Sequence, residues 1–117
     1  MYVADEVKFV TLIPADVVLE SDFSLPALFD QALRPGAGFV SIDLDGLDAA
    51  SAPGVSAPSP LGLGVGHATR LAEAAGGDAR GGHFDLMELC PAHDLGGRTA
   101  RVAALLFLSF IAGWRRR

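Results

Sequence analysis

Three short apolar runs along the chain have the composition of β-strands. They are Val7 to Ile13, Gly38 to Leu44 and His83 to Leu89. Pro14 closes the first run, and the second has so few polar positions that we expect it to be covered on both faces. Strands of this kind are typical of a parallel sheet.

Apolar residues at helical spacing predict three helices between and after these strands. The segments are Leu25 to Leu33, Ala68 to Ala75 and Arg98 to Ala112, each bordered by Gly or Pro residues. The alternation predicts an α/β fold: part of a three-layer fold with a parallel sheet, with about three strands and three helices present.

Asp45 to Gly66 is rich in Ala, Ser, Pro and Gly. We expect it to form a long ordered loop at a strand end, where such folds place their sites.

The number of predicted elements is small for a doubly wound sheet. With 117 residues, the chain forms one domain at most. A three-stranded parallel sheet leaves an edge and a face uncovered. We therefore expect a piece of something larger, or a protein that completes itself by association.

Composition and charge narrow the classes of function. The net charge is −5 and the positive cluster is confined to Arg115 to Arg117, so no nucleic-acid partner is expected. Cys90 is the only cysteine, so no intrachain disulfide forms, and we expect a cytoplasmic protein. The longest apolar run, Val102 to Trp114, is shorter than a membrane span of about 20 residues. We predict that it is a buried helix with no membrane partner.

The candidate chemistry lies at the end of the second predicted strand. Asp43 and Asp45 are two residues apart, so on an extended backbone their side chains point to one face, with Cα atoms about 7 Å apart. Two carboxylates this close repel each other unless a cation lies beside them. Oxygen ligands of this kind suit hard divalent ions such as Mg or Mn. The direct inference is a metal site at the end of the sheet.

Other interpretations of these residues compete with a metal site. Asp43 and Asp45 by themselves are also typical of a solvated turn, because Asp-Gly pairs are common in loops. A calcium loop of the helix-loop-helix type fails, because Gly54 stands where the bidentate Glu belongs. The segment Gly62 to Gly66 has some likeness to a dinucleotide loop. It follows a Pro-rich stretch instead of a strand, and His67 takes the place of the third Gly.

The residues around the aspartate pair extend the pattern well beyond two positions. They read Ser41-Ile-Asp-Leu-Asp-Gly-Leu-Asp48, then Ala52-Pro-Gly54 and Pro58-Ser-Pro-Leu-Gly-Leu63. Downstream, Phe84-Asp-Leu-Met-Glu-Leu-Cys-Pro91 precedes Asp94 and Arg98-Thr-Ala100. Together these segments resemble the signatures of the ureohydrolase family, which comprises arginases, agmatinases and formimidoylglutamases. Among the subfamilies, the residues of these segments are most similar to those of formimidoylglutamases.

The resemblance implies a function and roles for three residues. It implies manganese-dependent hydrolysis of a linear amidine or guanidine C–N bond. Formimidoylglutamate, cleaved to glutamate and formamide, is the leading substrate, and arginine and agmatine are the alternatives. By the same resemblance Asp43 bridges two manganese ions, Asp45 binds one of them, and Glu88 faces the amidine of the substrate. A carboxylate holds a planar cationic amidine by paired charge-assisted hydrogen bonds. Asp48 matches a third acidic position, which we interpret as structuring the loop.

The chain also departs from the family pattern. The Gly-Gly-Asp-His and Asp-Ala-His-x-x-x-Asp segments, which supply the remaining ligands in the family, are absent, and His67, His83 and His93 match neither. We therefore expect residues 1–117 to be the C-terminal part of a ureohydrolase-like domain with an incomplete ligand set. Three hypotheses follow: a split half that needs an N-terminal half, a non-catalytic remnant or association module, and a mononuclear metal domain that completes its site with a second copy.

Overall fold

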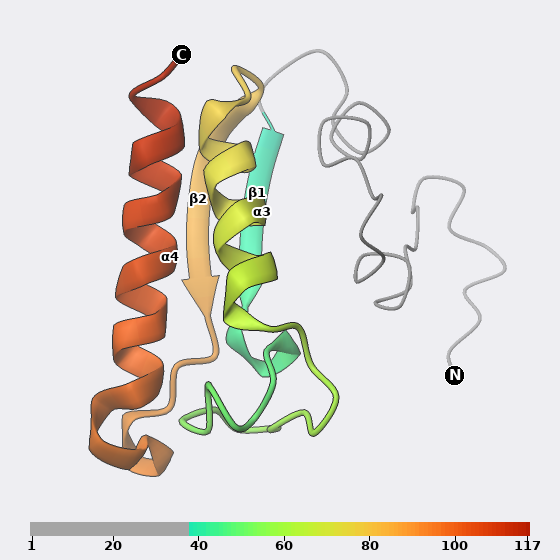
Figure 1. Ribbon diagram of the computed structural model, residues 1–117, viewed down its shortest axis with the longest axis vertical. Coiled ribbons are helices and arrows are strands. Elements are labelled where there is room, and N and C mark those ends of the chain that lie inside the picture. Colours follow the sequence, from blue (N-terminus) through green and yellow to red (C-terminus); the bar gives the residue numbers. More distant parts are fainter. Residues whose placement is uncertain (1–37) are drawn as a thin grey trace, which may run out of the picture.

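The computed structural model describes residues 38–117 of the chain. Its helices and strands are β1 (Gly38–Asp43), α3 (Val65–Gly77), β2 (Gly81–Met87) and α4 (Arg98–Trp114), and short 3-10 turns lie at Leu44–Gly46, Pro91–His93 and Leu95–Gly97 (Figure 1). The predicted strand Val7 to Ile13 and the predicted helix Leu25 to Leu33 lie outside the described residues.

The two strands form a parallel pair, with α3 as the connection between them (Figure 1). Val40 lies opposite Phe84 and Ile42 lies opposite Leu86. A strand, a helix and a parallel strand form the β-α-β unit that the alternation of patterns predicts. The predicted α/β class is therefore confirmed. The described residues hold two of the three predicted strands.

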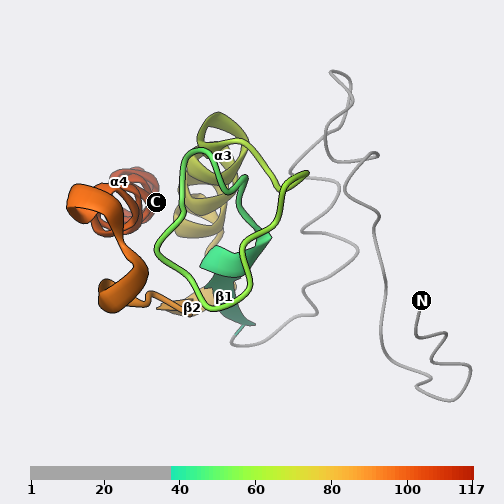
Figure 2. The same cartoon turned by 90° about the horizontal axis from the view of Figure 1, so that it is seen from below.

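The two faces of the sheet have different surroundings. Val40, Ile42, Phe84 and Leu86 point toward the helices, and α3 lies over this one side of the strands (Figure 2). The other face carries Phe39, which is 62% exposed. In the described part of the chain the prediction that β1 is covered on both faces is therefore wrong. The reason is that α3 and α4 both pack on the same side of the sheet.

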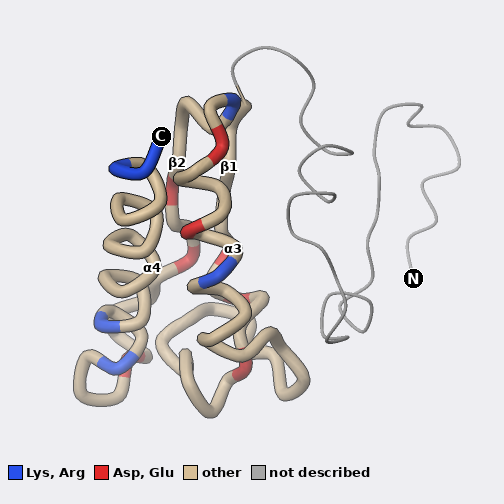
Figure 3. The backbone as a smooth tube through the Cα atoms, turned by 45° about the horizontal axis from the view of Figure 1, so that its top comes forward, with Lys and Arg blue, Asp and Glu red and all other residues tan. Residues whose placement is uncertain are grey.

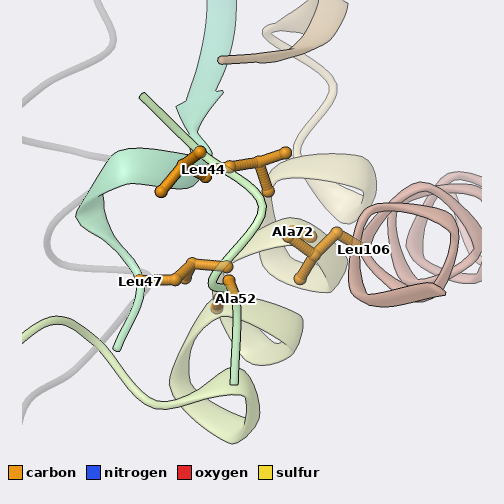
Figure 4. Close-up of a cluster of buried hydrophobic side chains, with 7 residues drawn as sticks. Leu44, Leu47, Ala52, Ala72 and Leu106 are labelled. Atoms are coloured by element: carbon orange, nitrogen blue, oxygen red, sulfur yellow. The ribbon is translucent and has the colours of Figure 1, made fainter. Parts of the chain in front are cut away.

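The core lies between the end of β1, the following loop and the two helices. Leu44, Leu47, Ala52, Ala72 and Leu106 are fully or almost fully buried in it, and Leu106 of α4 points toward Ala72 of α3 (Figure 4). Burying a leucine side chain contributes about 2 kcal/mol. The strand, the loop and both helices are thus joined by one cluster.

The helices α3 and α4 approach each other through glycine. A Cβ on Gly76 would overlap the Phe110 carbonyl oxygen, and a Cβ on Gly113 would overlap the carbonyl oxygen of Glu73. The helix predicted to end at Ala75 ends two residues later, at Gly77, so both glycines belong to its last turn. Gly76 is needed here for the close approach of the helices, whereas the sequence pattern suggested a break.

The arginines that follow α4 bind the C-terminal part of α3 and the start of β2. The Arg117 guanidinium donates hydrogen bonds to the carbonyl oxygens of Gly76, at 2.7 Å, and Gly81, at 2.6 Å. Carbonyl groups in the last turn of a helix have no partner within the helix, so a cation there is favourable. Arg116 also pairs with Glu73.

The helix α4 is buried on one side only. Thr99, Leu106 and Gly113 are buried, while Leu105 and Leu108 are 46% and 62% exposed. The prediction of a buried helix is therefore wrong for the described structure, because α3 and β2 contact a single side of α4. Basic residues lie at both ends of this apolar helix (Figure 3).

The helix α4 together with the 3-10 turn before it resembles a membrane span in length and composition. The segment Leu95–Trp114 is long and apolar enough to cross a membrane, and 17% of its most apolar window is buried. Core helices of soluble proteins pass the same test, so this finding is weak evidence for membrane contact.

Candidate functional site

Asp43 ends β1 and begins a tight turn. The strand stops at Asp43, and Leu44–Gly46 form a 3-10 turn in which the Asp45 N–H donates to Oδ1 of Asp43, at 2.9 Å. The prediction of a strand extending to Leu44 is therefore wrong by one residue, and the two aspartates do not extend from one face of a continuous strand. The physical reason is local, because a carboxylate that accepts a backbone N–H favours a turn over a strand.

The loop that follows Asp45 contacts both carboxylate oxygens of this residue. The Ser56 hydroxyl lies 3.4 Å from Oδ2 of Asp45, and the backbone N–H of Ala57 lies 3.4 Å from Oδ1. Asp48 holds the near part of the loop, since its Oδ1 accepts the Ala50 N–H at 2.8 Å. Its predicted role in structuring the loop is confirmed.

Glu88 lies at the same end of the sheet. The register places Asp43 opposite Met87, so Glu88 follows β2 directly beside the end of β1. The Ser56 hydroxyl lies 3.2 Å from Oε2 of Glu88, as well as contacting Asp45. The structure therefore brings two residues from separate sequence motifs to one hydroxyl group.

The backbone of Glu88 is strained. Its φ is 68°, and within the described residues no other non-glycine residue has a positive φ. This left-handed conformation costs a residue with a side chain about 1–2 kcal/mol. The same kink ends β2 at Met87, so the strand predicted to reach Leu89 is shorter, and it begins earlier, at Gly81. Strain of this kind is common at functional sites.

The loop that carries Ser56 is fixed to the start of α4. The Gly54 N–H donates to the buried Oγ1 of Thr99 at 2.7 Å, and the Cys90 N–H donates to the Gly54 carbonyl at 2.8 Å. A Cβ on Gly54 would meet Asp94, so only glycine fits. The separate motifs around Gly54, Cys90 and Thr99 are therefore parts of one scaffold.

The Asp94 side chain accepts hydrogen bonds from backbone N–H groups in the first turn of α4. Its two carboxylate oxygens accept the N–H groups of Thr99, at 2.8 Å, and Ala100, at 3.0 Å. Desolvation by itself raises the pKa of Asp94, but these backbone hydrogen bonds outweigh it and hold the pKa below its usual value. Carboxylates are favourable at this position because the first N–H groups of a helix lack partners.

The candidate site fits a divalent metal in the type of its ligands but not in their number. Asp43 and Asp45 offer carboxylate oxygens, which suit manganese. In residues 38–117 no three His, Cys, Asp or Glu residues are grouped so as to hold a metal ion. His93 contacts the Val55 carbonyl through Nδ1, at 3.3 Å, and so belongs to the loop scaffold. Further ligands would have to come from elsewhere.

Ser56 is the site residue that sequence reasoning missed. Its segment, Val55-Ser56-Ala57, follows the Ala-Pro-Gly motif, but a serine in a loop carries no chemical signal of its own. The signal that would have found it is its place inside the longest run of family-like sequence. Its contacts with Asp45 and Glu88 appear only in the folded chain.

Comparison with known proteins gives a consistent match. The model of the arginase family matches residues 10–113 of the chain. A formimidoylglutamase from Halobacterium salinarum is 46% identical over 76 residues, which cover 64% of this chain and 24% of that protein. A formimidoylglutamase from Klebsiella pneumoniae is 33% identical over 103 residues, covering 86% of this chain and 32% of that protein.

Solved structures agree with the sequence matches. A formiminoglutamase from Trypanosoma cruzi crystallised with Mn²⁺ superposes with a TM-score of 0.73 at 31% identity, covering 80% of this chain and 31% of that one. Proclavaminate amidino hydrolase from Streptomyces clavuligerus gives 0.69 at 29% identity, covering 79% and 30%. The chain spans about a quarter to a third of the length of the relatives it matches.

Proposed function

The chain belongs to the arginase family, and from this premise we propose that it contributes Asp43, Asp45 and Glu88 to manganese-dependent hydrolysis of a linear amidine C–N bond. Formimidoylglutamate is the favoured substrate, cleaved to glutamate and formamide, and arginine and agmatine are the alternatives. The names of the curated relatives support this choice.

One observation carries the proposal beyond the family match. The Ser56 hydroxyl contacts both Asp45, from the β1 motif, and Glu88, from the β2 motif. These contacts join the carboxylates of Asp45 and Glu88 at the end of the sheet where Asp43 ends β1. In the described part of the chain no ion pair joins them to a basic side chain. Carboxylates gathered in this way favour cations, both divalent ions and amidinium groups.

Each residue has a separate role in this mechanism. Asp43 and Asp45 would hold the metal, and the chemistry that divalent ions supply when bound is the acidification of water. Glu88 orients the amidine through its two carboxylate oxygens, so that its carbon is presented in a fixed position. Ser56 and Ala57 hold the Asp45 side chain in place.

The proposed metal site needs more ligands than Asp43 and Asp45, so another polypeptide has to supply them. We propose that they come from a polypeptide carrying the two histidine segments, an N-terminal half, or from a second copy of this chain. Among residues 38–117, the exposed Phe39 on the sheet and the exposed side of α4 favour association in either case. The same exposed surfaces favour the alternative function, a non-catalytic association module.

Manganese binding by the 117-residue chain tests the metal role. We expect binding, measured by calorimetry, that Asp43→Asn and Asp45→Asn each weaken at least tenfold, since each removes a charged ligand. Asp78→Asn, at the opposite end of the sheet, is the matched control and should bind as the wild type does. Equal binding by all four proteins would contradict the proposal.

Hydrolysis tests the reaction and the substrate. Formimidoylglutamate, arginine and agmatine are supplied to the chain with Mn²⁺, with and without a separate polypeptide that carries the two histidine segments. We expect activity only in its presence, greatest on formimidoylglutamate and lost in Glu88→Ala. A complex that forms with the added polypeptide but cleaves none of the three substrates would favour the association module.

A further inference from the structure

The edge of β2 that faces away from β1 has no strand beside it in the described part of the chain. The sheet of residues 38–117 has the order β1-β2, so β2 pairs with a described strand along one side only. The backbone N–H and C=O groups of a strand point alternately to both sides, and each needs a hydrogen-bond partner. A strand edge of this kind is a template on which another strand can pair.

The helix α4 lies over the space next to this edge. Both views of the fold show α4 beyond β2, on the side away from β1 (Figures 1 and 2). The rings of Phe110 and Phe84 stack with centroids 4.3 Å apart, which holds α4 against β2. Phe107 lies one helical turn before Ile111, so it shares this side of the helix, and it is 50% exposed. An apolar side of α4 therefore lies above a position that no described strand occupies.

A small cavity opens between the start of β2 and the end of α4. Its volume is about 260 Å³, and it is lined by Gly81 and Gly82 of β2 and by Phe110, Ile111 and Trp114 of α4. Pockets that take whole small molecules measure about 300–1,000 Å³, so this cavity is better suited to one large apolar side chain. Trp114 is 54% exposed and would be covered by such a side chain.

We propose that the outer edge of β2 binds a β-strand of another polypeptide beneath α4, and that a large apolar side chain of this strand fills the cavity at Gly81 and Gly82. Only an extended backbone pairs with the alternating N–H and C=O groups of a strand edge. For the identity of the polypeptide, the N-terminal half, the inference rests on the proposed function and states where that half binds. The chain spans about a third of its relatives' length, so most of the polypeptide that could supply the strand lies outside it.

Charge distinguishes this partner from a second copy of the chain. Arginines lie at both ends of α4, among them Arg101 and Arg115 (Figure 3). Two copies that paired through their β2 edges would bring their α4 helices together, with like charges at the helix ends. A strand that has apolar residues in its middle and acidic residues at its ends is complementary to this surface.

A synthetic peptide tests whether the edge binds a strand. The probe is acetyl-Glu-Val-Thr-Phe-Thr-Val-Glu-amide, which has one apolar face, an aromatic centre and acidic ends. We expect it to shift the fluorescence of Trp114, the single tryptophan of the chain, to shorter wavelength and to slow amide hydrogen exchange at alternate residues of β2. The same peptide N-methylated at its five inner residues keeps the side chains but cannot pair with a strand, and it should not bind. No binding of the unmodified peptide would overturn the proposal.

Two variants on different sides of α4 locate the binding surface. Phe107→Glu places a charge beside the edge, and we expect it to weaken peptide binding by about tenfold or more. Leu105→Glu is the matched control, since Leu105 is 46% exposed and successive helix residues are about 100° apart, which puts it on the other side of α4. It should bind as the wild type does. Circular dichroism checks that each variant is folded. Equal weakening by both variants, or slower exchange in β1 alone, would contradict the proposed surface.

The same variants separate this inference from the proposed function. In the hydrolysis experiment, Phe107→Glu should prevent the complex with the added polypeptide, measured by sedimentation, whereas Glu88→Ala should form the complex and lack activity. A complex that tolerates Phe107→Glu would show that the edge proposal is wrong and leave the proposed function intact. A complex that Phe107→Glu prevents, but whose wild-type form cleaves no substrate, would support the edge proposal and contradict the proposed function. Self-association of the wild-type chain that Phe107→Glu abolishes would overturn the choice of partner.

Discussion

Near the N-terminal ends of β1 and β2 the backbones of α3 and α4 lie against each other, whereas at the C-terminal ends of the strands three acidic side chains are gathered. The first region, the packing end, contains the crossing of α3 and α4 at Gly76 and Gly113 and the contacts of Arg117 with Gly76 and Gly81. The second region, the site end, contains Asp43, Asp45, Ser56 and Glu88. The two ends lie at opposite ends of the strands (Figure 1).

The packing end contributes mainly to the stability of the fold, and the site end carries the residues proposed to bind cations. Close packing at the packing end leaves no room for a side chain, so the tolerance for substitution there is small. The site end gathers carboxylates and holds Glu88 at a φ of 68°, which lowers stability. We therefore expect substitution of the glycines at the helix crossing to destabilise the protein most. Substitutions at the site end should alter binding and leave the fold intact.

The largest effect is expected from Gly113→Val at the packing end. The new side chain would overlap the Glu73 carbonyl oxygen and force α4 away from α3. We expect a loss of about 3 kcal/mol in the free energy of unfolding, which is a large part of the stability of a small domain. Urea denaturation followed by circular dichroism measures it.

Gly66→Ala is the control for this substitution. A Cβ at Gly66 meets nothing within 4 Å, and alanine favours the helix, so we expect a gain of about 0.5 kcal/mol. Equal losses in Gly113→Val and Gly66→Ala would mean that close packing at the helix crossing does not set the stability.

An effect of opposite sign is expected from Glu88→Gly at the site end. Glycine adopts a φ of 68° without strain, so we expect the free energy of unfolding to rise by about 1 kcal/mol. The same change should abolish binding of acetamidine, a small planar amidine cation, because the carboxylate is lost. Glu88→Gln, which keeps a side chain at this φ, should weaken binding without the gain in stability. A Glu88→Gly protein less stable than the wild type would contradict the proposed strain.

The smallest effect is expected from acid titration of Asp78, at the packing end. The hydrogen bond from the Arg80 side chain lowers the pKa of Asp78 from 3.8 to about 2. Because the folded pKa lies below the unfolded one, the stabilisation is complete above pH 3.8 and is lost as pH falls toward 2.

The matching variant for this titration is Asp78→Asn. It should lower the free energy of unfolding at neutral pH by about 1 kcal/mol or less, because the ion pair is screened by solvent. The melting temperature, measured across that acidic range, should depend on pH less steeply in the variant than in the wild type. Identical slopes would show that the pair contributes no stability.

Local patterns predicted the described elements well, except at glycine and at strand ends. The strand at Gly38, the loop after Asp45 and the helix at Arg98 are found where the apolar spacing placed them. The glycines after Ala75 were interpreted as a stop because a sequence shows a missing side chain but not the neighbour that requires it. Leu105 and Leu108 were expected to be buried because a sequence shows apolarity but not how many sides of a helix are covered.

The amino-acid sequence by itself determined the family, the α/β class and the residue types at the sheet end, since these follow from local patterns and from runs of matching residues. Only the tertiary structure decided that Asp45 and Glu88 meet at Ser56, that both described helices lie on one face of the sheet, and that Gly76 and Gly113 let two helices touch. The physical reason is that such contacts join residues distant along the chain, and each depends on how the backbone between them is folded.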